Sequence, residues 1–174
     1  MRQPVDRDRL GVFLRRLGRE ASEPATCYLS GGATAILVGW RGSSADVDVR
    51  LEPDRDELFE AIRRLKDELR TNVELASPAD FIPMPSGWRD RSPLVGTEGR
   101  LAIRHMDMRA QALAKIERGH PRDLLDVAAM LERRLVFAAD LRDAFVEIEP
   151  ALARFPAIDP AGFRRRLETA LSAV

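Results

Sequence analysis

Apolar residues recur at helical spacing in two early stretches of the chain. Between residues 5 and 21 they fall on one broad face between arginines, and Asp6 or Asp8 is placed to cap the helix. Between Pro53 and about Arg70 a second stripe is formed by Leu58, Ile62, Leu65 and Leu69. Both stretches are predicted to be amphipathic helices that bury one face in a core.

Short apolar runs predict strands around these helices. The first strand is expected at 25–29, the second at 46–51 and the third at 72–76. Two more are expected near 93–96 and 101–105, joined by a turn that contains two glycines. Because helices and strands alternate in this half of the chain, we expect a sheet with helices packed on it.

After residue 106 the chain has only helical patterns. Helices are predicted at 110–116, 121–131, 136–153 and 159–174. The sequence therefore predicts an α+β fold, in which a small mixed β-sheet with flanking helices is followed by a C-terminal helical segment. We expect two domains, the α/β core at 1–106 and the helical segment at 107–174.

The stretch from Phe81 to Arg91 is too rich in proline and glycine for a regular element. It is predicted to be an ordered loop anchored by Phe81 and Trp88, with Arg89 and Arg91 exposed. Trp88 and the two arginines offer a surface for a base and a phosphate. An aromatic residue that plugs the end of the core is the equally strong alternative.

Two aspartates alternate with valines on the second predicted strand. Because side chains two residues apart on a strand point the same way, Asp46 and Asp48 share one face while Val47 and Val49 enter the core. Two carboxylates this close repel each other unless a cation lies between them. The pattern predicts a site for one or two divalent metal ions such as Mg²⁺.

A serine and two glycines precede these acids at a strand-to-helix junction. Ser30, Gly31 and Gly32 are expected to form a turn before a small-residue helix from Ala33 to Trp40. Glycine lets backbone N–H groups approach a phosphate, and the helix N-terminus adds its positive end. Taken singly, a Gly-Gly turn or a solvated Asp-x-Asp edge is the simpler explanation, but the two motifs together favour a site.

A third acid is expected on the next strand. Glu74 lies between Val73 and Leu75 in the same apolar-acid-apolar alternation, so it reaches the face of the two aspartates if the strands are neighbours. Asp80 is the rival, and a turn or helix cap is its simpler role. Strand geometry favours Glu74.

Composition narrows the classes of protein that fit. The 174 residues are 45% hydrophobic and carry 28 basic and 28 acidic side chains, so no global basic field for nucleic acid exists. Cys27 is the one cysteine, which predicts a buried structural thiol. His105 and His120 have no partner at metal-ligand spacing and are expected to be structural. No leader or membrane-spanning run is visible, so a cytoplasmic protein is expected.

Only Lys66 and Lys115 are lysines among the basic residues. A lysine in an arginine-rich chain suggests a need for a compact point charge, for example one that lies next to a triphosphate. Lys66 lies among charged residues on the solvent-facing side of its helix and is expected to be solvated. Lys115 precedes a segment in which Asp123 and Asp126 share one helix face.

These motifs resemble known signatures in their order and spacing. Leu29-Ser30-Gly31-Gly32, a spacer of thirteen residues and Asp46-Val47-Asp48-Val49 resemble the signature of the polymerase-beta-like nucleotidyltransferase superfamily. Ala114-Lys115-Ile116-Glu117-Arg118 followed by Arg122-Asp123-Leu124-Leu125-Asp126 is similar to its AbiEii-like branch, a bacterial group that includes toxin–antitoxin enzymes. The resemblance covers roughly residues 25 to 135.

The resemblance implies transfer of a nucleoside monophosphate from an NTP, such as ATP, to an acceptor. It implies that Asp46 and Asp48 hold two Mg²⁺ ions, with Mn²⁺ as the alternative metal, and that Glu74 either ligates one metal or activates the acceptor hydroxyl. Ser30, Gly31 and Gly32 would meet the phosphates, and Lys115 would lie near the triphosphate. Asp123 and Asp126 would position Lys115 or Arg118.

The acceptor and the biological role are less determined by sequence. The toxin-like resemblance ranks tRNA or protein above a small molecule as acceptor, and it suggests a small cognate partner protein from a neighbouring gene. An inactive nucleotide-binding or partner-binding module, like an antitoxin, is the non-enzymatic alternative. A metal nuclease is a second rival, although the Gly-Gly turn and Lys115 argue against it.

Overall fold

The computed structural model describes residues 3–172, which divide into two compact units. The sheet unit comprises Met1–Ser77 and Ser92–His105, and the helical unit comprises Pro78–Arg91 and Met106–Val174. Residues 78–91 therefore group with the helices that follow them later in the chain. The domain division at residue 106 stays a prediction.

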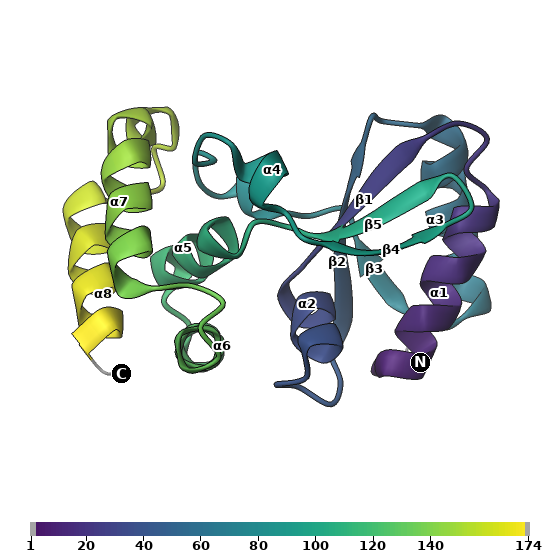
Figure 1. Ribbon diagram of the computed structural model, residues 1–174, viewed down its shortest axis with the longest axis horizontal. Helices are drawn as coiled ribbons and strands as arrows, with labels where there is room; N and C mark the ends of the chain where they lie inside the picture. Colours follow the sequence, from purple (N-terminus) through teal and green to yellow (C-terminus); the bar gives the residue numbers. More distant parts are fainter. Residues whose placement is uncertain (1–2, 173–174) are drawn as a thin grey trace. The chain divides into compact units, whose positions relative to one another are not determined.

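The sheet unit contains a five-stranded mixed sheet in the order β3-β2-β1-β5-β4 (Figure 1). The strands are β1 (Ala25–Ser30), β2 (Asp46–Glu52), β3 (Asn72–Glu74), β4 (Leu94–Glu98) and β5 (Leu101–His105). β1 is antiparallel to β2 and parallel to β5. β2 and β3 are parallel, while β4 and β5 are antiparallel. The predicted mixed sheet is confirmed, although β3 is shorter than expected.

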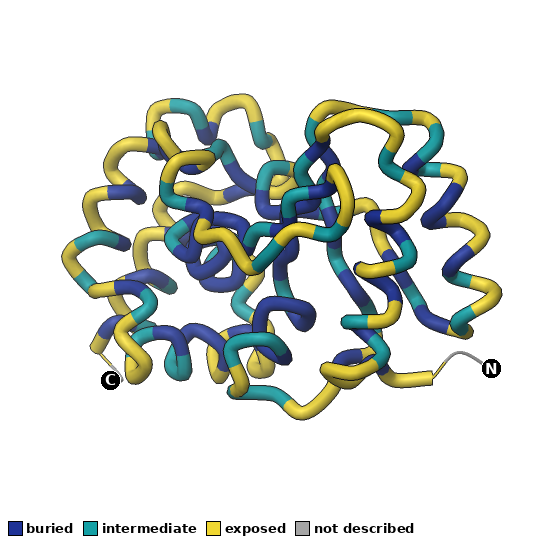
Figure 2. Tube along the Cα trace, turned by 45° about the vertical axis from the view of Figure 1, so that its right-hand side comes forward, coloured by how far each residue is buried: buried dark blue, intermediate teal, exposed yellow. Residues whose placement is uncertain are grey.

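Helices cover one face of this sheet. They are α1 (Arg7–Arg19), α2 (Gly31–Val38) and α3 (Asp56–Glu68). The Asp6 side chain caps α1 by accepting from the N–H of Arg9 at 2.9 Å, as predicted. Val47 and Val49 of β2 are buried in one cluster with the apolar stripes of α1 and α3. Figure 2 shows the resulting alternation of buried and exposed residues along the helices.

The alternate residues of the strands form the opposite, polar face of the sheet. Since residues 27, 29, 47, 49, 73 and 103 lie in the core cluster, their strand neighbours point away from it. The polar face carries Tyr28, Ser30, Asp46, Asp48, Arg50, Asn72, Glu74 and Arg104. The fold thus places the predicted acids on the side of the sheet opposite the core.

The helical unit contains α5 (Met108–Arg118), α6 (Pro121–Glu132), α7 (Ala138–Ile148) and α8 (Pro160–Ser172). Phe145 and Phe163 join α7 to α8 edge to face, with ring centroids 4.9 Å apart. A single helix over 136–153 was the wrong prediction, because the chain changes to a 3-10 helix at Glu149–Arg154. Pro150 lies at its start and lacks the N–H that α-helix continuation needs.

The segment between β3 and β4 differs from its predicted form. It contains a 3-10 turn, η1 (Pro78–Asp80), and a short helix, α4 (Trp88–Arg91). Trp88 is buried as expected, but Phe81 is 50% exposed and so is not an anchor. Arg91 is not simply exposed, since it donates from Nε (3.1 Å) and from Nη2 (2.7 Å) to Asp107. Arg91 therefore holds the segment to the start of α5.

No helix within residues 3–172 is long and apolar enough to cross a membrane.

Candidate active site

Strands β2 and β3 bring the three predicted acids to one face of the sheet unit. Asp48 pairs with Ser30 of β1 on one side and with Glu74 of β3 on the other. Asp46 is half-buried, as is Asp48, whereas Glu74 is exposed. The expectation that β3 lies beside β2 is confirmed, and the catalytic and metal-binding roles of the three acids stay predictions.

An amide donor lies between two of these carboxylates. The Nδ2 group of Asn72 donates to Asp46 Oδ1 at 2.5 Å and to Glu74 Oε1 at 3.1 Å. A partly positive N–H group therefore stands where two negative oxygens converge. The sequence pattern alone does not indicate Asn72, although its place two residues before Glu74 puts it on the same strand face.

The two glycines allow α2 to begin against β2. Gly31 has φ +56°, and a Cβ on it would lie 2.4 Å from Asp48 Oδ2. A Cβ on Gly32 would lie 2.0 Å from Ser44 Oγ. Neither position accepts a side chain without displacement of a neighbour. Glycine is thus required here by the close approach of β2, a reason that the sequence alone does not reveal.

The helix begins two residues earlier than predicted. α2 starts at Gly31 with Ser30 as its N-cap residue, so no separate turn precedes Ala33. Its first-turn N–H groups consequently open directly beside Asp48. The N-terminus of a helix carries a partial positive charge and backbone donors that suit phosphate oxygens.

Ser44 fixes the approach to β2. Its backbone exchanges two hydrogen bonds with Val5, at 2.7 and 2.9 Å, and its Oγ accepts from the N–H of Asp46 at 3.4 Å. The chain before α1 therefore braces the residues that lead into the two aspartates.

The donor set fits a magnesium ion that is shared with a phosphate. Within the described residues, no group of three or more His, Cys, Asp or Glu side chains is arranged to hold a metal. Mg²⁺ does not need such a cage, because it binds through one or two carboxylates, waters and substrate phosphates. The carboxylates of Asp46 and Asp48 are of the hard oxygen type that such an ion binds, and Asp48 Oδ2 lies only 2.4 Å from where a Cβ on Gly31 would be.

A second cluster of charges lies in the helical unit. Lys115 Nζ donates to Asp126 Oδ2 at 2.6 Å and to Asp123 Oδ1 at 3.2 Å. Arg118 donates two hydrogen bonds to the carboxylate of Asp123, at 2.7 and 2.8 Å. Asp123 and Asp126 therefore do position Lys115 and Arg118. The contact of Lys115 with a nucleotide stays a prediction.

Burial and charge act in opposite directions on Asp123. Burial alone would raise the pKa of its carboxyl group, but hydrogen bonds from Arg118 and the nearby charge of Lys115 lower that pKa below its ordinary value. The side chain of Lys115 is only 7% exposed, whereas that of Arg118 is 58% exposed. The cluster is thus a buried ammonium between two carboxylates with one guanidinium at its edge.

The family assignment comes from the comparison with known proteins. Residues 13–143 match the family described as nucleotidyltransferase of unknown function (DUF6036). The chain belongs to this family. No curated protein sequence matches it.

A solved structure resembles this chain in fold. The crystal structure of an antigenic nucleotidyltransferase-like protein from Paracoccidioides brasiliensis is similar, with a TM-score of 0.51 and 14% sequence identity. The match covers 98% of this chain and 95% of that chain. It shows a nucleotidyltransferase-like fold. Membership of the AbiEii-like branch stays a prediction.

The cysteine and the two histidines of the sequence lie in structural positions. Burial raises the pKa of the Cys27 thiol to about 12, so the thiol is not a nucleophile at neutral pH. His105 is buried at the end of β5, where burial lowers its pKa to about 4. His120 caps α6, because its side chain accepts from the N–H of Arg122. Both histidines therefore lie in the structural positions that were expected.

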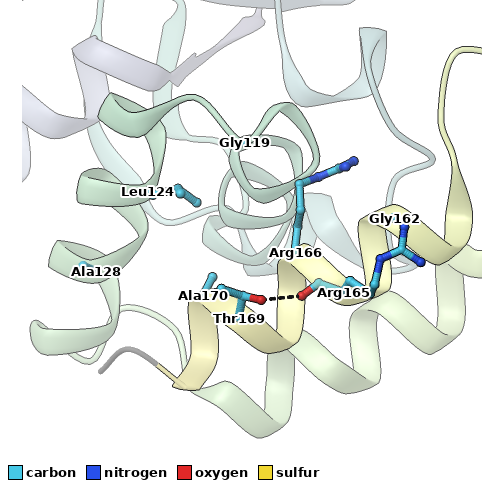
Figure 3. A pocket seen from close by; sticks show the side chains of 8 residues that line it. All are labelled: Gly119, Leu124, Ala128, Gly162, Arg165, Arg166, Thr169 and Ala170. Carbon is cyan, nitrogen blue, oxygen red and sulfur yellow. Dashed lines mark hydrogen bonds between the residues drawn. The ribbon is translucent and has the colours of Figure 1, made fainter.

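The helical unit also contains a groove of about 400 Å³ between α6 and α8 (Figure 3). It is lined by Gly119, Leu124, Ala128, Gly162, Arg165, Arg166, Thr169 and Ala170. The Thr169 hydroxyl donates to the carbonyl of Arg165, one turn earlier on α8. These lining residues include no carboxylate, so they offer none of the predicted metal chemistry.

Proposed function

We propose that this protein transfers a nucleoside monophosphate from an NTP to the hydroxyl group of an acceptor. The observation that carries the proposal is the juxtaposition of Asp46 and Asp48 with the N-terminus of α2, made close by Gly31. One strand thus offers metal ligands and one helix offers phosphate donors at the same place. Family membership and fold support nucleotidyl transfer as the class of reaction.

In this proposal the triphosphate lies at the start of α2. Backbone N–H groups of the first turn donate to the β- and γ-phosphate oxygens, and Ser30, the N-cap residue, would meet the phosphates with Gly31 and Gly32. Bound Mg²⁺, or Mn²⁺, held by Asp46 and Asp48 would neutralise phosphate charge and polarise the reacting oxygens. The glycines let the start of α2 lie against Asp48 and Ser44, which occupy the space that side chains at Gly31 and Gly32 would need.

Glu74 is proposed to accept the proton of the acceptor hydroxyl. It is exposed and in register with Asp48, so its carboxylate shares the face on which the acceptor hydroxyl attacks. Its rival Asp80 lies on η1, in the other compact unit. Glu74 also has a place as a third metal ligand, provided that the Asn72 amide turns away from it.

The finer parts of the proposal rest on the resemblance in sequence. Lys115 is assigned to the triphosphate, with Asp123 and Asp126 as its positioning residues. We rank tRNA or protein above a small molecule as the acceptor. A small partner protein encoded nearby would make the pair a toxin–antitoxin system.

The first prediction tests the two aspartates. The Asp46→Asn, Asp48→Asn double variant removes both metal ligands but keeps their size, so release of pyrophosphate from ATP, CTP, GTP or UTP should fall at least about 100-fold. Release is measured with Mg²⁺ and a cell extract as the source of acceptors. Asp67→Asn, an exposed aspartate on α3, is the matched control and should behave as the parent protein does. Undiminished release by the double variant would reject the assignment.

One observation favours a second candidate, an inactive nucleotide-binding or partner-binding module. The Asn72 amide already satisfies oxygens of Asp46 and Glu74 that a metal would need. This candidate predicts that Mg·ATP binds in calorimetry while no pyrophosphate appears with any acceptor. The parent protein in the experiment above therefore distinguishes the two.

A further inference from the structure

A row of cationic and aromatic residues crosses the polar face of the sheet unit next to the acids. Tyr28 of β1 pairs with Arg50 of β2 on one side and with Arg104 of β5 on the other. The adjacent row on the same face contains Ser30 and Asp48. The two rows are two residues apart along the strands, about 7 Å.

The two arginines of this row differ in their partners. Arg50 is paired with Glu52, at 3.1 Å from Nε and 3.0 Å from Nη2. Arg104 is half-buried and donates from Nη1 to the carbonyl of Ser92 at 2.7 Å. Among residues 3–172, no carboxylate forms an ion pair with Arg104. A half-buried guanidinium without a counter-charge favours an anionic ligand.

The place of Arg104 decides which anion it meets. β1 runs from Tyr28 to Ser30 and then into α2, so Asp48 and Glu74, which lie in the row of Ser30, come between the arginine row and the N-terminus of α2. In phosphoryl transfer the attacking and leaving oxygens are roughly in line, on opposite sides of the phosphorus atom. If the leaving pyrophosphate lies at α2, the acceptor must come from the side of the arginine row.

We infer that Arg104 binds a phosphate group of the acceptor, next to the hydroxyl that is modified. This inference rests on the proposed function and adds the chemical class of its second substrate. The acceptor oxygen forms a bond to the α-phosphorus, and the bond from that phosphorus to the bridging oxygen breaks. Pyrophosphate leaves with the electron pair, and the hydroxyl proton passes to Glu74.

The spacing suits an acceptor of nucleotide size. Arg104 is two strands from Asp48 and two residues back, which places their Cα atoms about 12 Å apart. Beside Arg104 on the sheet edge, Leu94 is 57% exposed and offers an apolar surface for a base or sugar. A nucleic-acid terminus and a phosphorylated sugar both carry a phosphate near a hydroxyl, and the experiment separates them.

The second prediction tests Arg104 with two acceptor probes, a 12-nucleotide single-stranded RNA and ribose 5-phosphate. Their binding is measured by calorimetry with Mg²⁺ and a non-hydrolysable ATP analogue present. Arg104→Gln keeps an N–H donor for the carbonyl of Ser92 but removes the charge, so it should weaken binding about tenfold. Arg104→Lys should restore part of the affinity. Arg63→Gln, at a side chain that is 73% exposed on α3, is the matched control.

Each outcome of this experiment is decisive. Tighter binding of the RNA identifies a nucleic-acid terminus, and its salt dependence should then lose roughly 0.7 of a unit of slope in Arg104→Gln. Tighter binding of ribose 5-phosphate identifies a small phosphorylated acceptor. Binding of neither probe, or equal binding by the parent protein and Arg104→Gln, overturns the inference.

The ATP analogue separates this inference from the proposed function. Its own affinity, measured without a probe, should depend on Asp46 and Asp48 and change less than about twofold in Arg104→Gln. Loss of probe binding with intact analogue binding supports the subsite. An analogue that does not bind the parent protein at all rejects the proposed function, whatever Arg104 does.

Discussion

At the scale of single residues, Thr34 determines where the proton of His105 lies. The Thr34 hydroxyl is 3.1 Å from the carbonyl of Leu29, to which it donates, and 3.1 Å from His105 Nδ1. Because a hydroxyl has one proton, Nδ1 must be the donor to Thr34. Because burial also lowers the pKa of His105 to about 4, the ring is neutral at pH 7, and its contact with Thr34 ties the end of β5 to α2.

The third prediction follows from the pKa of His105. Its pKa falls from 6.5 in the unfolded chain to about 4 in the folded protein, because burial disfavours the charged ring. The unfolded state thus binds more protons than the folded state between these two pH values. The free energy of unfolding is therefore at its full value above pH 6.5 and decreases as the pH falls toward 4.

The free energy of unfolding is measured with urea at pH 7.5 and pH 5. Between them the parent protein should lose about 2 kcal/mol more than His105→Gln, which cannot titrate. The comparison at pH 7.5 is the control, because at that pH His105 of the parent protein carries almost no charge in either the folded or the unfolded state. The same pH dependence in both proteins would contradict the assignment of a neutral buried ring.

At the scale of elements, the contact between α2 and the start of β2 determines the geometry of the candidate site. Gly32 faces Ser44, whose Oγ and Cβ would be 2.0 and 2.4 Å from an added Cβ. The fourth prediction is that Gly32→Ala destabilises the protein by about 1–3 kcal/mol, because one of the two elements must shift. Urea unfolding measures the stability, and calorimetry measures the affinity for Mg·ATP.

A compensating change tests this contact directly. Ser44→Gly removes both atoms that the new methyl group would meet, so the double variant should regain most of the stability and of the nucleotide affinity. Gly42→Ala is the matched control, since an added Cβ there has no neighbour within 4 Å. If Gly32→Ala is as stable as the parent protein, α2 does not begin where the structure places it.

At the scale of the whole molecule, local patterns predict elements better than they predict partners. The alternation on β2 is readable because one face of that strand is buried, and the acids follow from it. Asn72, by contrast, meets Asp46 only through the pairing of β3 with β2. Arg104 joins the same face through the parallel pairing of β5 with β1, which no local pattern contains.

The segment between β3 and β4 illustrates the same limit. Its proline and glycine content correctly indicates irregular structure, but the partner that holds Arg91 is Asp107, on a later element. Charge on an arginine does not reveal whether it meets solvent, a ligand or a buried carboxylate. For this reason the predicted exposure of Arg91 was wrong, whereas the pairing of Lys115 with two nearby acids was confirmed.

The fifth prediction asks whether the helical unit takes part in nucleotidyl transfer. Lys115→Met removes the ammonium group that lies 2.6 Å from the buried carboxylate of Asp126 and should destabilise the protein by about 3–5 kcal/mol, measured by urea unfolding. Loss of pyrophosphate release in that variant alone would not separate a role in folding from one at the triphosphate. Lys115→Met with Asp126→Leu removes both charges, while Asp123 keeps Arg118 as its partner.

The double variant should therefore regain most of the lost stability, because an apolar pair replaces a buried ion pair. If Lys115 meets the triphosphate, pyrophosphate release should nevertheless stay at least about tenfold below that of the parent protein, with a raised KM for the NTP. Return of activity together with stability would make the cluster purely structural and would leave the nucleotide to the sheet unit. The two measurements on one protein thus decide whether the buried lysine serves the fold or the reaction.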